Sequence, residues 1–328
     1  MQESPQKSRK SNRARIGKRS DPIASRRAAV RVSECTQAGA LESTPARASK
    51  CTPAHARKLA RLEKAIARCD SALVAFSGGV DSTFLLSVAK EVLGERLLAV
   101  TAVSPVVQPD EVESAKTLAK KLGVAHEVIH TDEVMHEEYC SNPPERCYYC
   151  KQVLFSRLTA LARERGLACV IEASNADDTG DYRPGLRAVK ELGVKSPLIE
   201  AKLTKAEIRA LSRERKLPTW NKPALACLAS RFPYGERITV EKLDQVLKGE
   251  EYLLSLGFSS CRLRYYGKLV RIEVPEEEIR RLLESALRRR ISARLKALGF
   301  QYITVDIEGY RSGSMNETLP AAKRRAND

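Results

Sequence analysis

Short apolar runs alternate with longer amphipathic segments from residue 56 onward, and this alternation constrains the fold more than any other feature. Apolar runs lie at 71–76 (SALVAF), 97–103, 126–130 and 168–173, and the segments between them carry apolar residues at helical spacing. Strands that alternate with helices predict an α/β fold, in which helices cover both faces of a parallel sheet. Ligands of such sheets bind beyond the carboxyl ends of the strands.

The pattern changes near residue 238. A helix near 239–256, paired strands within 261–274, a helix near 276–298 and a strand at 301–308 predict a small α+β domain. We expect one antiparallel sheet with helices on one face. The sequence therefore predicts four regions: a disordered basic leader (1–55), an α/β domain (56–237), a small α+β domain (238–310) and a C-terminal tail (311–328).

Charge is concentrated in the leader. The net charge of the chain is +16, but residues 1–58 hold 14 basic and 4 acidic residues and account for +10 of it. The remaining +6 fits an anionic small molecule as well as RNA, so we expect nucleic acid to bind only through non-specific leader contacts. The leader also resembles an organellar transit peptide in composition, and an upstream start codon chosen in error would look the same.

No apolar stretch approaches the roughly 20 residues that cross a bilayer, and the charged N-terminus is unlike a secretory signal. These features predict a cytoplasmic protein. Nine cysteines in such a chain indicate free thiols, a metal site or redox chemistry rather than a disulfide framework.

The strongest local motif is SGGVDS, Ser77 to Ser82, between the first apolar run and a helix. Gly78 and Gly79 let the backbone approach an oxyanion, and the helix directs unpaired N–H groups at it. Ser77 and Ser82 add hydroxyl donors, and Asp81 suits Mg²⁺ that bridges phosphates. The alternative is an ordinary strand–turn–helix with a capping residue.

SGGVDS after a strand resembles the PP-loop of ATP pyrophosphatases. The resemblance implies adenylation, in which a substrate oxygen attacks the α-phosphate of ATP and pyrophosphate leaves. Asp177 and Asp178, in the SNADD segment after the fourth apolar run, would then be metal ligands, or else part of a solvated turn.

Two further motifs contain cysteine. Cys147 and Cys150 form a C-x-x-C at the start of a helix, where two thiolates can chelate one metal or cluster edge. Cys227 lies in an irregular segment near the cation Arg231, which favours a thiolate. A buried structural cysteine is the alternative for Cys227.

Candidate substrate groups lie in the last third of the chain. Arg262 and Arg264 project from one face of a strand, and two guanidiniums side by side suit a phosphate. Arg231 is a further candidate for pyrophosphate or carboxylate, and Glu273 for a metal. A solvated strand face is the alternative for the two strand arginines.

The motifs SGGVDS, NPPERCYYCK, WNKPALACLASRFPYGE, RLRYYGKLVRIEV and GYRSGSMNE together resemble the LarE family of PP-loop sulfur transferases, over about residues 56–317. The resemblance implies an ATP-dependent sulfurtransferase for the nickel-pincer nucleotide cofactor. Its substrate would be pyridinium-3,5-biscarboxylic acid mononucleotide, whose carboxylates become thiocarboxylates. It also implies a homo-oligomer and hand-over to a nickel-inserting enzyme.

The family resemblance implies two sulfur sources. In one, Cys147, Cys150 and Cys227 hold a [4Fe–4S] cluster whose open iron carries sulfide. In the other, Cys227 gives up its own sulfur. Because a C-x-x-C pair is unnecessary if one cysteine is consumed, the sequence favours the cluster. A PP-loop tRNA-thiolating enzyme and a non-catalytic nucleotide-binding regulator are the alternative functions.

Overall fold

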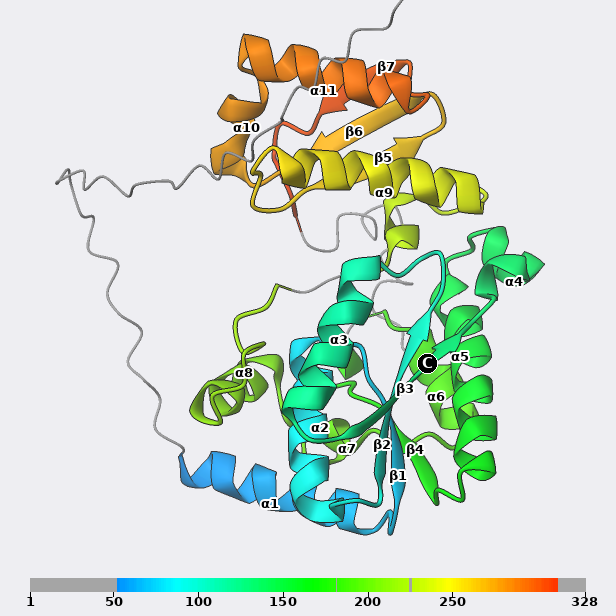
Figure 1. The fold of residues 1–328 in the computed structure, drawn as a ribbon, viewed down its shortest axis with the longest axis vertical. Helices are drawn as coiled ribbons and strands as arrows, with labels where there is room; N and C mark the ends of the chain where they lie inside the picture. Colours follow the sequence, from blue (N-terminus) through cyan, green and yellow to red (C-terminus); the bar gives the residue numbers. More distant parts are fainter. Residues whose placement is uncertain (1–51, 181, 224–225, 312–328) are drawn as a thin grey trace, which may run out of the picture. The chain divides into compact units, whose positions relative to one another are not determined.

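A four-stranded parallel sheet organises the first part of the chain (Figure 1). The computed structural model describes residues 52–180, 182–223 and 226–311. The strand order is β3-β2-β1-β4, and all three pairings are parallel. The strands are β1 (Ala72–Ala75), β2 (Leu97–Val103), β3 (Ala125–His130) and β4 (Cys169–Ile171). The predicted α/β fold with a parallel sheet is confirmed.

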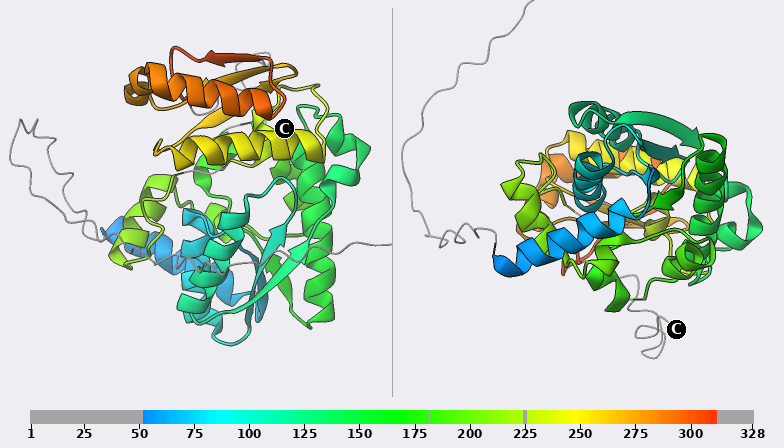
Figure 2. Two further views of the ribbon diagram at one scale, coloured as in Figure 1. Left: turned by 45° about the horizontal axis from the view of Figure 1, so that its top comes forward. Right: turned by 90° about the horizontal axis from the view of Figure 1, so that it is seen from below.

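Helices cover both faces of this sheet, as the continuous apolar strands require. Successive residues of β1 point to opposite faces: Ala72 and Val74 belong to one apolar core, and Leu73 to another. Helices α1, α2, α3 and α8 contribute to the first core, and α5 and α6 to the second (Figures 1 and 2). The helices of this region are α1 (Pro53–Ala67), α2 (Val80–Leu93), α3 (Pro109–Lys121), α4 (Glu137–Cys140), α5 (Arg146–Glu164), α6 (Gly185–Glu191), α7 (Pro197–Glu200) and α8 (Lys205–Glu214).

Local sequence explains where several helices begin. Thr52 caps α1, accepting a hydrogen bond from the backbone of His55, and Pro53 occupies the first turn. Thr204 and Glu207 form a reciprocal capping box at α8. Helix α1 thus starts three residues inside the predicted leader. The rest of the leader, and all but the first residue of the predicted tail, lie outside the described residues.

A second, three-stranded sheet follows, in the order β5-β6-β7. Its elements are α9 (Val240–Ser255), β5 (Arg262–Tyr266), β6 (Leu269–Glu273), α10 (Glu276–Leu282), α11 (Ser285–Ala297) and β7 (Tyr302–Val305). Strands β5 and β6 are antiparallel, but β6 and β7 are parallel, so the expectation of an antiparallel sheet is wrong. Because α10 and α11 form a crossover between β6 and β7, the chain returns in the same direction. The single helix expected near 276–298 is divided into these two.

Close packing joins α9 to the second sheet. Gly249 faces β5, and a Cβ atom at this position would collide with the side chain of Leu263. Both sheets belong to one compact unit. Within the described ranges, no helix has the length and apolar character needed to cross a membrane.

Candidate functional site

The SGGVDS segment forms a tight turn between β1 and α2. Gly78 has φ +68°, and a Cβ atom there would come within 3.3 Å of the Ala115 backbone, so the turn requires glycine. Gly79 precedes α2, and no side chain caps the first N–H groups of that helix. Ser77 and Ser82 place their hydroxyl oxygens 3.1 Å apart. The turn therefore presents backbone and hydroxyl donors at the carboxyl end of β1.

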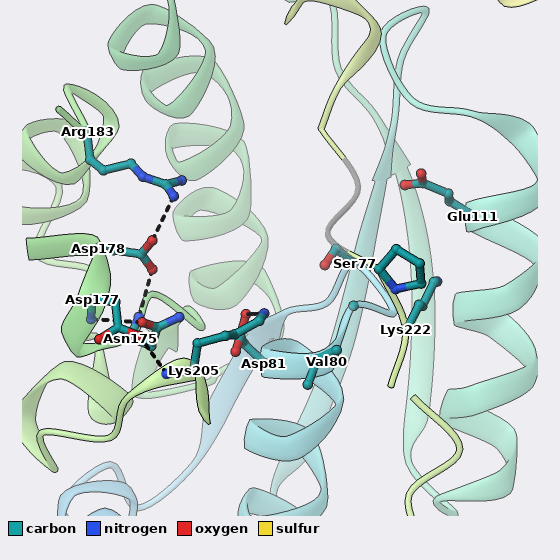
Figure 3. A pocket seen from close by; sticks show the side chains of 12 residues that line it. Ser77, Val80, Asp81, Glu111, Asn175, Asp177, Asp178, Arg183, Lys205 and Lys222 are labelled. Atoms are coloured by element: carbon teal, nitrogen blue, oxygen red, sulfur yellow. Dashed lines mark hydrogen bonds and ion pairs between the residues drawn. The ribbon is translucent and has the colours of Figure 1, made fainter. Parts of the chain in front are cut away.

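A polar cavity of about 520 Å³ opens at this turn (Figure 3). Ser77, Gly79 and Asp81 line it from the turn, and Lys205 and Lys222 line it from later segments. Its other charged residues are Glu111, Asp177, Asp178 and Arg183. Cations beside unpaired N–H groups suit phosphate oxygens.

An apolar cavity of about 390 Å³ adjoins the polar one. Both cavities include Ser77, Gly79, Asp81, Glu111 and Asp178. The apolar residues of the second cavity include Val100, Val107, Val112, Leu154, Phe155 and Leu158. Two joined cavities of this kind, one apolar and one lined with cations and hydrogen-bond donors, are suited to the two halves of a nucleotide.

Asp81 combines an ion pair with an open acceptor. Lys205 Nζ contacts Asp81 Oδ2, whereas Asp81 Oδ1 is buried without a hydrogen-bond partner among the described residues. Burial raises the pKa of Asp81, and Lys205 opposes that rise. A carboxylate oxygen with no partner among the described residues, beside a turn that presents N–H donors, suits Mg²⁺, which prefers oxygen ligands.

Hydrogen bonds of both aspartates hold the SNADD segment in place. Asp178 Oδ2 accepts from Asn175 N at 2.9 Å, and Asp177 Oδ2 accepts from Lys205 N at 2.8 Å. Asp178 also pairs with Arg183 at 3.1 Å. Both aspartates line the polar cavity, and through Lys205 the segment orients a cation toward Asp81. Their role as metal ligands stays a prediction.

Lys205, Lys222 and Glu111 all line the polar cavity, and none of them was singled out from the sequence. Lys222 Nζ donates to Gly78 O at 3.1 Å, and Lys205 begins α8. Glu111 lies in the first turn of α3; burial raises its pKa, while Lys222, Arg231 and Arg262 lower it. Glu111 thus stands in electrostatic range of both the polar cavity and the later arginines. Only the position of Lys222 in the WNKP motif offered a sequence signal.

The three predicted cluster cysteines lie in one neighbourhood. Cys147 and Cys150 occupy the first turns of α5, and Cys227 directly precedes the short 3₁₀ helix Leu228–Arg231. Cys147 and Cys227 are exposed, and Cys150 is half-buried. Surrounding protein raises the pKa of Cys150, and the charges of Cys227 and Cys147 raise it further.

Arg146 lies between the two cysteine segments. Its buried guanidinium donates to Ala229 O at 3.0 Å and to Asn142 Oδ1. Surrounding protein raises the pKa of the Cys227 thiol, and Arg146 opposes that rise. No three His, Cys, Asp or Glu side chains stand at metal-binding distances within the described residues, which omit 224 and 225 next to this segment.

Two of the predicted substrate arginines belong to a buried arginine network, defined here as Arg231, Glu250, Arg264 and Glu273. Arg231 donates to both carboxylate oxygens of Glu250 at 2.8 Å and is 0% exposed. It also donates to Cys227 O at 3.0 Å, so it anchors the cysteine segment. Arg264 donates to Glu273 Oε2 at 2.9 Å. These arginines therefore face carboxylates in this structure, and a phosphate role for them stays a prediction.

Glu273 and Arg262 differ in whether their charged atoms are already paired with other side chains. Glu273 gives its other oxygen to Arg271 at 2.9 Å, so both oxygens already accept from arginine. Its predicted magnesium role gains no support from this pairing. Arg262 lies over the ring of Tyr310 at 5.3 Å and has no carboxylate partner among the described residues. Of the three predicted arginines, Arg262 is the one available to an anion.

Comparison with known proteins identifies the family. Residues 57–168 match the model of the NAD synthase family. The pyridinium-3,5-bisthiocarboxylic acid mononucleotide synthase of Lactiplantibacillus plantarum is 40% identical over 82% of this chain and 97% of its own length. The chain belongs to the LarE family. Membership makes it an enzyme, and its PP-loop class is ATP-dependent.

Other relatives match over a similar span. The uncharacterized protein slr1717 of Synechocystis sp. is 45% identical over 80% of this chain and 98% of its own length. The uncharacterized protein MJ0830 of Methanocaldococcus jannaschii is 30% identical over 73% and 90%, respectively. The LarE resemblance found from the motifs is thus confirmed over most of the chain.

Proposed function

We propose that the protein activates the carboxylates of pyridinium-3,5-biscarboxylic acid mononucleotide with ATP and converts them to thiocarboxylates. The observation that carries this proposal is the pair of joined cavities at Ser77–Ser82, which suits a nucleotide and leaves Asp81 Oδ1 unpartnered. The substrate class comes from the L. plantarum relative, whose name describes the bisthiocarboxylic product.

The chemistry requires an activated carboxylate because an oxygen must leave where sulfur enters. A carboxylate oxygen attacks the α-phosphorus of ATP, the bond to the β-phosphate oxygen breaks, and pyrophosphate leaves. A sulfur nucleophile then attacks the acyl carbon of the adenylate, and AMP leaves with the original oxygen. Two rounds convert both carboxylates.

The residues of the polar cavity have distinct roles in the first step. The turn at Gly78 and Gly79 directs N–H groups at the phosphates, and Lys205 and Lys222 balance the charge that pyrophosphate carries away. Asp81 would hold Mg²⁺ together with the phosphates, and this ion would neutralise phosphate charge. Arg262 is suited to the substrate's own phosphate.

Sulfur enters through the three-cysteine group, Cys147, Cys150 and Cys227. The three thiols lie close enough to influence one another's pKa, although they do not stand at metal-binding distances among the described residues. Three thiolates would leave one iron of a [4Fe–4S] cluster open. Such a cluster would supply sulfide, and Arg146 would offset the negative charge of the thiolates. Loss of sulfur from Cys227 itself is the second route, and its exposure permits that reaction. Homo-oligomeric assembly and hand-over to a nickel-inserting enzyme stay predictions.

Pyrophosphate release tests the overall proposal. We expect release from Mg-ATP only when the pyridinium biscarboxylate mononucleotide is present, with thiocarboxylate as the product. Release without this substrate, or none with it, would contradict the proposal. Binding of Mg-ATP with no release in any condition would support the regulator alternative.

One preparation separates the two sulfur sources. Anaerobically purified protein should contain about four iron and four sulfide per chain, and Cys147→Ala should lose them. A chain lighter by about 34 Da after turnover, the mass of H₂S, together with absence of iron, would establish the sacrificed cysteine instead.

A further inference from the structure

A second group of thiols lies at the amino edge of the parallel sheet. Cys69 follows α1 and Cys169 begins β4, and their side chains lie close enough for each thiol to shift the pKa of the other. Lys195 Nζ lies 3.6 Å from Cys69 Sγ. Three chemically reactive side chains from segments far apart in sequence therefore meet at one point.

Backbone contacts fix this arrangement. Cys169 pairs with Ala72 in the parallel register, and its Sγ lies 3.6 Å from Ser71 O. Lys195 N donates to Val170 O at 3.0 Å, and Lys195 O accepts from Glu172 N at 2.9 Å. The lysine is thus held beside β4 as a short extension of the sheet.

The thiol pair is separate from the nucleotide cavities. It lies where β1 and β4 begin, whereas the cavities open where these strands end. The four residues of β1 separate the two sites by about 13 Å at 3.3 Å per residue. Cys69 is 1% exposed and Cys169 is half-buried, so the pair reaches solvent through Cys169.

The surroundings favour one thiolate in the pair. The hydrogen bond from Cys169 and the charge of Lys195 lower the pKa of Cys69 to about 6, against desolvation and the charge of Glu200. The same hydrogen bond raises the pKa of Cys169, which keeps the proton, and Asp70 acts in the same direction. By contrast, burial raises the pKa of Cys261 and of Cys140. A thiolate hydrogen-bonded to a second thiol is the arrangement of a peroxide-sensitive pair.

We propose that Cys69 and Cys169 form an oxidation site, in which a peroxide converts the two thiols into an intramolecular disulfide beside Lys195. The Cys69 thiolate attacks one oxygen of hydrogen peroxide, forming an S–O bond as the O–O bond breaks and hydroxide leaves. The Cys169 sulfur then attacks the sulfenic sulfur, forming the S–S bond as the S–O bond breaks. The thiol proton leaves with that oxygen as water. Two thiols and one peroxide thus give one disulfide and two waters.

Peptide mapping of the full chain tests the site. Protein treated with hydrogen peroxide at pH 7 is alkylated under denaturing conditions and digested with trypsin. Cys69 then lies in the peptide 69–90 and Cys169 in 166–187, because Pro184 blocks cleavage after Arg183, and neither peptide contains another cysteine. We expect these two peptides joined, with a mass about 2 Da below their sum.

Variants test the assigned roles. Cys69→Ser and Cys169→Ser should abolish the joined peptide, whereas Cys261→Ala should leave it unchanged. Lys195→Met should slow formation of the joined peptide about threefold. Without the lysine charge the pKa of Cys69 rises, so less thiolate is present, but each thiolate is more nucleophilic, which partly offsets the loss. Oxidised wild-type protein should melt about 5 °C higher, because the bond links residues 69 and 169.

Either of two results overturns the proposal. One is separate oxygenation of the two peptides without joining. The other is that both stay unmodified while other cysteines oxidise. The mapping needs no substrate or nucleotide, so its result is independent of the proposed sulfur insertion.

Discussion

The polar cavity and the buried arginine network contain the same kinds of charged side chains, but differ in how completely these are paired. In the arginine network, Arg231 spans both oxygens of Glu250, and Glu273 accepts from two arginines. In the polar cavity, one oxygen of Asp81 has no hydrogen-bond partner in the part of the chain that the structure describes. Completed pairs hold segments in place, whereas an incomplete one beside open space can bind a ligand. The difference separates a structural group from a binding group, and four variants test it.

The largest effect is expected from Glu250→Gln. This change leaves the buried guanidinium of Arg231 without its counter-charge, and should lower the free energy of unfolding by about 3–5 kcal/mol. Urea unfolding measures it. The adjacent, exposed Glu251→Gln is the matched control and should change stability by less than about 0.5 kcal/mol. Equal effects at both positions would show that the arginine network does not anchor the fold.

Asp81→Asn should reduce activity strongly and stability only slightly, the opposite of Glu250→Gln. We expect the rate of substrate-dependent pyrophosphate release to fall about 100-fold, because a magnesium ligand is lost. This fall corresponds to about 2.7 kcal/mol of transition-state stabilisation. The free energy of unfolding should change by less than about 1 kcal/mol. Exposed Asp110→Asn serves as the control and should retain activity. A large stability loss with normal turnover would place Asp81 with the structural pairs.

Lys222→Met should weaken Mg-ATP binding about tenfold, since it removes one positive charge from the polar cavity. Calorimetry at two salt concentrations measures the loss, which should shrink at high salt. Exposed Lys190→Met on α6 is the control. Unchanged affinity in Lys222→Met would show that this lysine supports the turn through Gly78 and does not bind ATP.

The smallest difference is expected between Gly78→Ala and Gly267→Ala. Both glycines have φ near +66° to +68°, but only Gly78 faces the Ala115 backbone. Both changes should cost about 1 kcal/mol from left-handed strain, with a further loss of similar size at Gly78. Thermal unfolding compares them, and only Gly78→Ala should weaken ATP binding. Equal losses would mean that the turn tolerates a side chain.

Local sequence was sufficient for most of the first sheet and for the turn. Apolar runs, helical spacing and the two glycines predicted the strands, the helices and the turn between β1 and α2, because each depends on near neighbours in the chain. The direction of β7 was not predictable in this way. It depends on how α10 and α11 pack between β6 and β7, which a list of elements does not specify.

The sequence by itself determined the α/β fold, the glycine turn at Ser77–Ser82 and the family motifs. Only the tertiary structure decided which charges are paired. The sequence predicted phosphate contacts for Arg231 and Arg264, and only the structure showed that Glu250 and Glu273 pair with them. Lys205 likewise contacts Asp81 through the placement of α8. Charged side chains act through the nearest opposite charge in space, and that partner is often remote in sequence.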